Sequence, residues 1–107
     1  MNKQRRSRIR IICENLNQLP QETDKAKLLE RCNDIKSEID DVQYDEEDAF
    51  DNMPENLQYS MRGEESQDAI DSMQNASDAL DELSEDSNID DIYKAIDFAE
   101  DEISDII

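Results

Sequence analysis

The sequence predicts an all-α protein, either an antiparallel helical hairpin or a small four-helix arrangement with coiled-coil-like packing. Apolar residues recur every three or four positions in four separate stretches, which is the spacing of one face of a helix. No stretch alternates apolar and polar residues for long, as a half-buried strand would. A chain of 107 residues suits one domain, so we expect a single helical domain over residues 1–107.

The first two helices are expected near residues 3–19 and 23–51. The apolar stripe of the first helix consists of Ile9, Ile12, Leu16 and Leu19. Pro20 ends or kinks this helix because proline has no amide hydrogen, and Thr23 can cap the next one. The stripe of the second helix consists of Leu28, Cys32, Ile35, Ile39 and Val42.

A break around Pro54 separates the second helix from the third, because a residue before proline avoids the α conformation. Ser60 can cap a third helix near 61–86, and Ser87 followed by Asp90 resembles a capping box that starts a fourth near 88–106. The two stripes are Ala69, Met73, Ala76, Leu80 and Leu83, then Ile89, Ile92, Ile96, Ala99, Ile103 and Ile106. Because such narrow stripes bury little, we expect a hairpin of the second and third helices, flanked by the other two, and a dimer that completes the core.

Charge is distributed unevenly along the chain. Asp and Glu number 30 against 11 Lys and Arg, which gives a formal net charge of -19. Residues 1–36 hold nine basic and five acidic side chains, whereas residues 37–107 hold two basic and 25 acidic ones. This charge exceeds what solubility requires and destabilises the compact state by self-repulsion. It therefore indicates a role that depends on charge.

The composition argues against catalysis. The chain has no His and one Gly, so it lacks the commonest general base and any glycine-rich phosphate loop. Residues 45–52 are rich in carboxylates but do not fit the calcium-loop template. Cys13 and Cys32 are expected to be reduced core thiols of a cytoplasmic protein. A disulfide between them is the alternative, with nothing in the sequence to support it. Two thiolates alone cannot complete a tetrahedral metal site. We therefore expect a non-enzymatic protein without cofactor or metal, and an apolar run no longer than Ile11–Cys13 predicts a cytoplasmic protein.

The N-terminal segment, residues 1–10, holds five of the 11 basic side chains. It could bind nucleic acid, contact an anionic membrane, or neutralise acidic helices of its own fold or of a second copy. The surplus of acid elsewhere would repel phosphates, which favours the last interpretation.

The acidic helices suggest mimicry of a nucleic acid. Sixteen carboxylates lie between Glu64 and Asp105, with few basic residues among them. A fixed carboxylate offers an Arg or Lys of a partner the contact that a phosphate would offer. The alternative is an ordinary solvated helix face. The residues predicted to bind a partner are Asp78, Asp81, Glu82, Glu85, Asp86, Asp90, Asp91, Asp97 and Asp101.

The segment Asp51-Asn52-Met53-Pro54-Glu55-Asn56-Leu57-Gln58-Tyr59-Ser60-Met61-Arg62-Gly63-Glu64 resembles a family of small acidic helical proteins from phages and mobile elements of Gram-positive bacteria. The likeness covers roughly residues 40–85. It implies a phage-like origin and a helical hairpin, and it supplies no functional residues. In size and charge, the chain is also similar as a class to phage inhibitors that mimic DNA, including anti-CRISPR proteins.

These observations lead to three hypotheses. The first is an acidic, DNA-mimicking inhibitor that occupies the nucleic-acid-binding surface of a bacterial defence nuclease, of anti-CRISPR or anti-restriction type. The second is a structural or assembly coiled coil that acts by homo-oligomerisation. The third is a regulator whose Arg-rich N-terminus binds nucleic acid directly.

Overall fold

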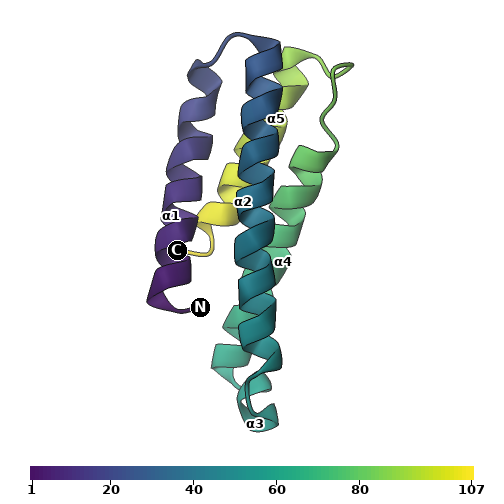
Figure 1. Cartoon of the computed structure of the whole chain (residues 1–107). Coiled ribbons are helices and arrows are strands. Elements are labelled where there is room, and N and C mark those ends of the chain that lie inside the picture. Colours follow the sequence, from purple (N-terminus) through teal and green to yellow (C-terminus); the bar gives the residue numbers. More distant parts are fainter.

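Four long helices run alternately up and down and close into a bundle, as the computed structural model shows for all 107 residues (Figure 1). Each helix packs against the next, and the last packs against the first, so that α1 lies diagonally across from α4. There is no strand, and the all-α fold class is confirmed. The elements are α1 (Lys3–Gln18), the 3-10 turn η1 (Leu19–Gln21), α2 (Lys25–Asp51), α3 (Glu55–Gln58), α4 (Met61–Asp81) and α5 (Ile89–Ser104).

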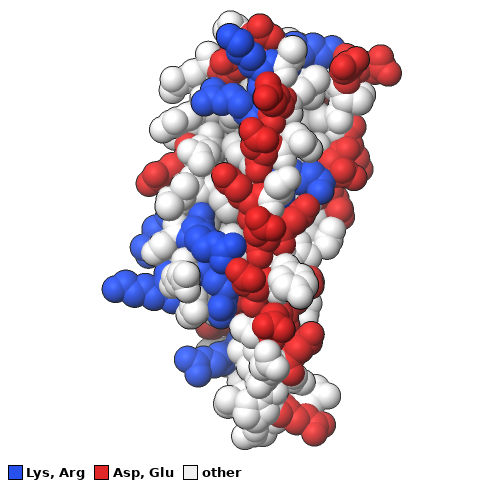
Figure 2. Space-filling view, in the orientation of Figure 1, with Lys and Arg blue, Asp and Glu red and all other residues white.

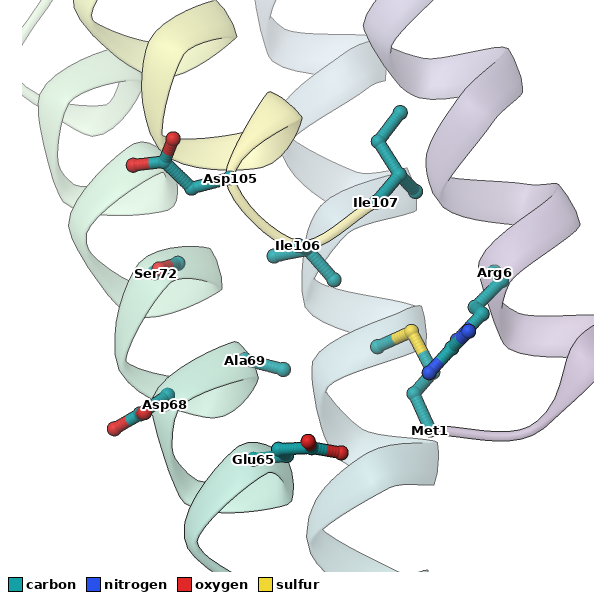
Figure 3. Close-up of a pocket in the computed structure, with 9 residues that line it drawn as sticks. All are labelled: Met1, Arg6, Glu65, Asp68, Ala69, Ser72, Asp105, Ile106 and Ile107. Carbon is teal, nitrogen blue, oxygen red and sulfur yellow. The ribbon is translucent and has the colours of Figure 1, made fainter. Parts of the chain in front are cut away.

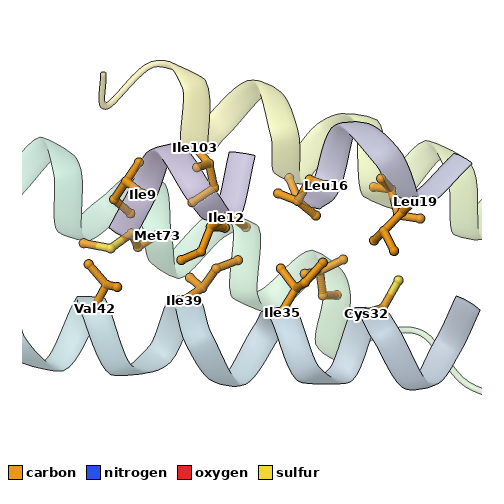
Figure 4. Close-up of a cluster of buried hydrophobic side chains, with 14 of the residues drawn as sticks. Ile9, Ile12, Leu16, Leu19, Cys32, Ile35, Ile39, Val42, Met73 and Ile103 are labelled. Carbon is orange, nitrogen blue, oxygen red and sulfur yellow. The ribbon is translucent and has the colours of Figure 1, made fainter. Parts of the chain in front are cut away.

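The four apolar stripes meet in one core inside a single chain (Figure 4). Seventeen buried apolar residues form the cluster, and Ile9, Ile39, Met73 and Ile96, one from each long helix, are fully buried. The stripes are narrow, as predicted, but each faces two neighbours in the closed bundle. The unfilled core that led us to expect a dimer is therefore not present in the single chain.

The predicted hairpin forms between α2 and α4, but the prediction missed the single helical turn α3 between them. Gln58 of α3 donates its side-chain amide to the Phe50 carbonyl at 3.0 Å. Gly63 packs so closely on this turn that a Cβ atom there would lie 2.1 Å from the Gln58 carbonyl oxygen. The turn therefore requires glycine at this position, although its backbone conformation is an ordinary one.

The prediction that the third helix continues to residue 86 is wrong, because α4 ends at Asp81. Short polar side chains after it bind the backbone and so compete with the helix. Ser84 Oγ accepts a hydrogen bond from the Asp86 amide at 3.2 Å, and Ser87 Oγ accepts one from the Ser84 amide at 3.1 Å. Ser87 is thus used inside the turn, and Asn88 caps α5 in its place.

The other helix ends agree with prediction to within two residues. Ser60 caps α4, as predicted. The predicted capping role of Thr23 is wrong, because the neighbouring Asp24 accepts hydrogen bonds from the amides of Ala26 and Lys27 at 3.0 and 3.3 Å.

The hairpin of α2 and α4 extends beyond the other two helices. With 27 residues, α2 is about 40 Å long, whereas α1 and α5, with 16 residues each, are about 24 Å long. The end that carries α3 therefore lies past the N-terminal end of α1 and the C-terminal end of α5 (Figure 1). This overhang gives the molecule its longest dimension of 48 Å.

A buried carboxylate joins three of the helices. Glu46 of α2 is fully buried, and its Oε2 atom accepts a hydrogen bond from Arg5 Nε of α1 at 2.7 Å. Ser66 Oγ of α4 donates to its Oε1 atom at 3.0 Å, and the Met1 amino group lies 3.4 Å from the same oxygen. Desolvation makes an unpaired charge costly, so this network favours one register of α1 and α4 on α2.

Both cysteines are free thiols. Cys32 lies in the core, and its burial raises the pKa of the thiol to about 11. Cys13 is half-buried, and its pKa is raised by burial first and then by the nearby carboxylates of Glu100 and Glu14.

Replacing Glu46 with Ala should lower the free energy of unfolding by about 3 kcal/mol, because it leaves the Arg5 guanidinium without its buried partner. Asp45→Ala is the matched control. This variant removes the neighbouring ion pair, in which the side chains of Asp45 and Arg8 are 46% and 35% exposed. It should lower the free energy of unfolding by less than about 1 kcal/mol. Urea unfolding followed by circular dichroism measures both values. If Glu46→Ala and Asp45→Ala lowered the free energy of unfolding equally, the buried network would stabilise the fold no more than the exposed ion pair does.

The thiols should respond to pH in a defined direction. Cys32 should react with iodoacetamide very slowly in the folded protein at pH 8 and faster as the pH approaches 11. Because its folded pKa lies above the ordinary value of 9.0, Cys32 contributes stability that is fully present below pH 9 and is lost as the pH rises through about 11. The unfolded chain in urea is the control and should be alkylated rapidly at pH 8–9. Rapid alkylation of folded Cys32 at pH 8 would contradict this account.

Candidate partner-binding surface

The nine carboxylates predicted to bind a partner lie on α4, on α5 and in the loop between them, and all nine are exposed. Asp78 and Asp81 belong to α4, whereas Asp90, Asp91, Asp97 and Asp101 belong to α5. Because α4 and α5 pack side by side, the structure brings the nine residues onto two neighbouring helix surfaces. We call these outward surfaces, with their connecting loop, the α4–α5 face.

Three of the nine carboxylates were predicted to lie within a helix, but the structure places them after its end. Glu85 and Asp86 lie in the loop, and Glu82 is the C-cap residue that directly follows the last residue of α4, Asp81. The loop is nevertheless tied to the bundle, because Lys25 of α2 donates a hydrogen bond to the Glu85 carbonyl oxygen. These carboxylates extend the acidic surface past the end of α4, with geometry set by the loop.

Two further acidic rows were missed in the sequence. On α4, the outward residues Glu64, Asp68 and Asp71 continue the row of Asp78 and Glu82 at steps of three, four or seven. On α2, six carboxylates follow the same helical spacing, namely Glu30, Asp34, Glu38, Asp41, Asp45 and Asp48. The three-and-four spacing that located the apolar stripes would have located these rows if it had been applied to Asp and Glu.

The acidic row of α2 runs down the middle of the molecule beside the basic surface of α1 (Figure 2). Arg8 of α1 reaches across to Asp45, and Arg5 binds the buried Glu46. These bonds confirm that part of the N-terminal segment neutralises acid of its own fold. Lys3, Arg6 and Arg10 form no ion pair.

Few of the carboxylates are neutralised. The ion pairs of the chain involve only Glu22, Asp40, Asp45, Glu46 and Asp81, so 25 of the 30 acidic side chains have no cation within 4.0 Å. Asp81 is the only residue of the α4–α5 face that takes part in an ion pair, and its carboxylate lies 4.0 Å from the Lys36 amino group. A bond to Asp40 is the main reason that the pKa of Lys36 is raised.

Glutamine amides hold some of these carboxylates in place without cancelling their charge. Gln67 donates to Asp71 at 3.0 Å, and Gln74 donates to Asp78 at 2.8 Å. The Gln74 side chain also accepts a hydrogen bond from Gln43 of α2 at 2.8 Å. Asp78 is thus held by a chain of uncharged amide donors that crosses from α2 to α4.

A hollow of about 500 Å³ lies between the start of α1, the side of α4 and the last residues of the chain (Figure 3). Its lining includes the apolar side chains of Ala69 and Ile106 and the charged side chains of Arg6, Glu65, Asp68 and Asp105. This mixture of signs differs from the α4–α5 face, where Arg62 and Lys94 are the only basic residues of the two helices. No group of three or more Cys, Asp or Glu side chains in the protein is arranged to hold a metal ion.

None of the helices combines the length and the apolar character needed to span a membrane. Comparison with protein-family models, with curated proteins and with solved structures finds no match for the chain. The similarity to small acidic phage proteins therefore stays a prediction from residues 51–64.

The unpaired acidic rows should make folding more stable in salt, because counter-ions screen repulsion between exposed like charges. Raising NaCl from about 20 mM to about 500 mM should raise the melting temperature by roughly 5 °C or more. The melting temperature is followed by circular dichroism at 222 nm. The triple variant Asp68→Asn, Asp71→Asn and Asp78→Asn is the control and should respond less. An unchanged or lower melting temperature in salt would mean that repulsion is not the main electrostatic term.

Proposed function

We propose that this protein is a non-enzymatic inhibitor that mimics DNA and occupies the nucleic-acid-binding surface of a basic protein. The target class that best fits is a bacterial defence nuclease, either a CRISPR effector or a restriction enzyme. The protein would then act in the cytoplasm of a bacterial host cell.

The supporting observation is the row of carboxylates left without counter-charge on packed helices. Helix α4 is about 32 Å long and α5 about 24 Å, and each carries six acidic residues, so the two helices side by side carry roughly one negative charge per 2–3 Å of length. Duplex DNA carries one per about 1.7 Å. The α4–α5 face thus approaches the charge density of DNA.

This geometry accounts for both encounter and binding. A surface of one sign attracts a basic cleft over long range and speeds association, at low salt above all. At contact, Arg and Lys side chains of the cleft bind carboxylates in place of phosphates. Because the protein has no scissile phosphodiester, the cleft stays occupied and the nucleic acid is excluded.

The α4–α5 face is a better contact surface than the acidic row of α2. Arg8 already binds Asp45, and Arg31 lies on the same helix as that row. On α5, Lys94 is the only basic residue, and on α4 Arg62 is the only one. A basic partner would therefore meet less internal competition at α4 and α5.

A charge-reversal experiment tests this proposal. The triple variant Asp78→Lys, Asp97→Lys and Asp101→Lys should inhibit at least tenfold more weakly than wild type, because it turns attraction into repulsion at the contact. The measurement is DNA cleavage by a panel of purified CRISPR effectors and restriction endonucleases, at two salt concentrations and with excess DNA added as competitor.

The matched control reverses three carboxylates of α2, with Asp34→Lys, Glu38→Lys and Asp41→Lys. It changes the net charge by the same amount and should keep most of the inhibition. Circular dichroism checks that both variants remain helical. If no nuclease of the panel is inhibited and the protein instead forms a tight homo-oligomer, the assembly hypothesis replaces this one.

A further inference from the structure

The turn between α3 and α4 exposes large apolar side chains at the end of the hairpin. Leu57, Tyr59 and Met61 lie within five residues, and they are 36%, 80% and 76% exposed. We call residues 57–61 the tip. Three large apolar side chains displayed together are costly in water, and such residues mark interaction surfaces when they form a patch. The core of the bundle is complete without them.

The tip is held rigidly. The Leu57 carbonyl accepts hydrogen bonds from the amide and the hydroxyl of Ser60, and the same hydroxyl caps α4 by accepting from the Gly63 amide. Gln58 anchors the turn to the end of α2 through the carbonyls of Phe50 and Met53. Side chains on an ordered turn lose less conformational entropy on binding than side chains on a flexible loop.

The tip also lies where a partner can reach it. It is at the end of the overhang, past the ends of α1 and α5 (Figure 1). The residues around it are mainly acidic, because Asp51, Glu55, Glu64 and Glu65 accompany a single cation, Arg62. The apolar patch is thus bordered by negative charge.

We propose that the tip is an apolar anchor that inserts into a pocket rimmed by Lys and Arg on a basic protein. This rests on the proposed function in taking the partner to be the same basic protein that the α4–α5 face attracts. The acidic faces would supply long-range attraction, and the tip would supply short-range contact. Tyr and Met are enriched at the centres of protein interfaces, where a few such residues carry most of the affinity.

Charge complementarity favours a pocket with a basic rim over the two other possible occupants, a second copy of the chain and an anionic membrane. Two tips of the same chain would bring together their acidic borders, which repel each other. An anionic membrane would repel the border in the same way. A pocket with a basic rim satisfies the apolar centre and the acidic border together.

The experiment uses two synthetic peptides of equal length and charge, so that it does not depend on any nuclease. One alternates Lys with Leu along a helical face, and the other has Ser in place of each Leu. Isotope-labelled full-length protein is titrated with each peptide and followed by NMR. The Lys/Leu peptide should shift the amides of residues 57–62, whereas the Lys/Ser peptide should shift only those of the acidic rows.

The double variant Tyr59→Ser and Met61→Ser should bind the Lys/Leu peptide at least tenfold more weakly and the Lys/Ser peptide as wild type does. Tyr44→Ser is the matched control, since Tyr44 is 70% exposed on α2 outside the tip, and it should bind both peptides as wild type does. Circular dichroism shows that the variants are folded. Equal binding of the Lys/Leu peptide to wild type and double variant would overturn the anchor.

Two other outcomes would assign the tip elsewhere and also overturn the proposal. Self-association of wild type in sedimentation, lost in the double variant, would make the occupant a second copy. Flotation with phosphatidylglycerol vesicles, also lost in the variant, would make it a lipid surface. A positive peptide result together with a nuclease panel that shows no inhibition would reject the proposed function and leave the tip as a docking site for a basic apolar segment.

Discussion

The structure depends on the burial of four narrow apolar stripes against one another, because this is the main interaction that opposes repulsion among 30 carboxylates. Seventeen apolar residues are removed from water in a chain where Leu, Ile, Val and Phe number only 22. Twelve of these 22 belong to the core cluster, which Ala, Cys and Met side chains complete, and three of the seven large apolar side chains that stay exposed lie at the tip of the hairpin. A closed bundle is the arrangement in which each stripe covers two others, so little apolar surface supports a full fold.

The placement of charge follows from this constraint. Where acid enters the interior, the structure supplies partners, as Arg5 and Ser66 do for Glu46. Most of the acid that stays outside has no cation within 4.0 Å, with Asp45 and Asp81 among the exceptions, and neutral amides such as those of Gln67 and Gln74 hold some of these side chains. The protein thus neutralises the carboxylates that would harm folding and leaves charged those that face water.

The fold could be predicted from sequence because it rests on a strong periodic signal. Every apolar residue from Ile9 to Leu19 in the first stripe is buried, and so is each residue of the second stripe from Leu28 to Val42. The end of α4 could not be predicted, because the stripe continues to Leu83 while Ser84 and Ser87 redirect the backbone by local hydrogen bonds.

The candidate site was predictable only in part. The carboxylates of α4 and α5 were found from their number, but the rows on α2 and at the start of α4 need the helical spacing of the acids themselves. The pairing of Arg5 with Glu46 could not be found, because it joins residues 41 positions apart. The tip was hidden for another reason. The predicted ranges already make the second and third helices longer than the first and fourth, but the apolar stripes do not tell at which end of the bundle the extra length lies, and so they do not tell that residues 57–61 lie uncovered.

The position of α1 has one more consequence. It is the one long helix with a positive balance, with five basic residues and one acidic residue, and it stands diagonally across the bundle from α4. This separation gives the molecule an electric dipole moment perpendicular to its long axis, with α4 toward the negative pole. In the field of a positively charged surface, such a dipole feels a torque that turns α4 forward and α1 away. The protein would thus be oriented with α4 toward the positively charged surface before any side chains come into contact.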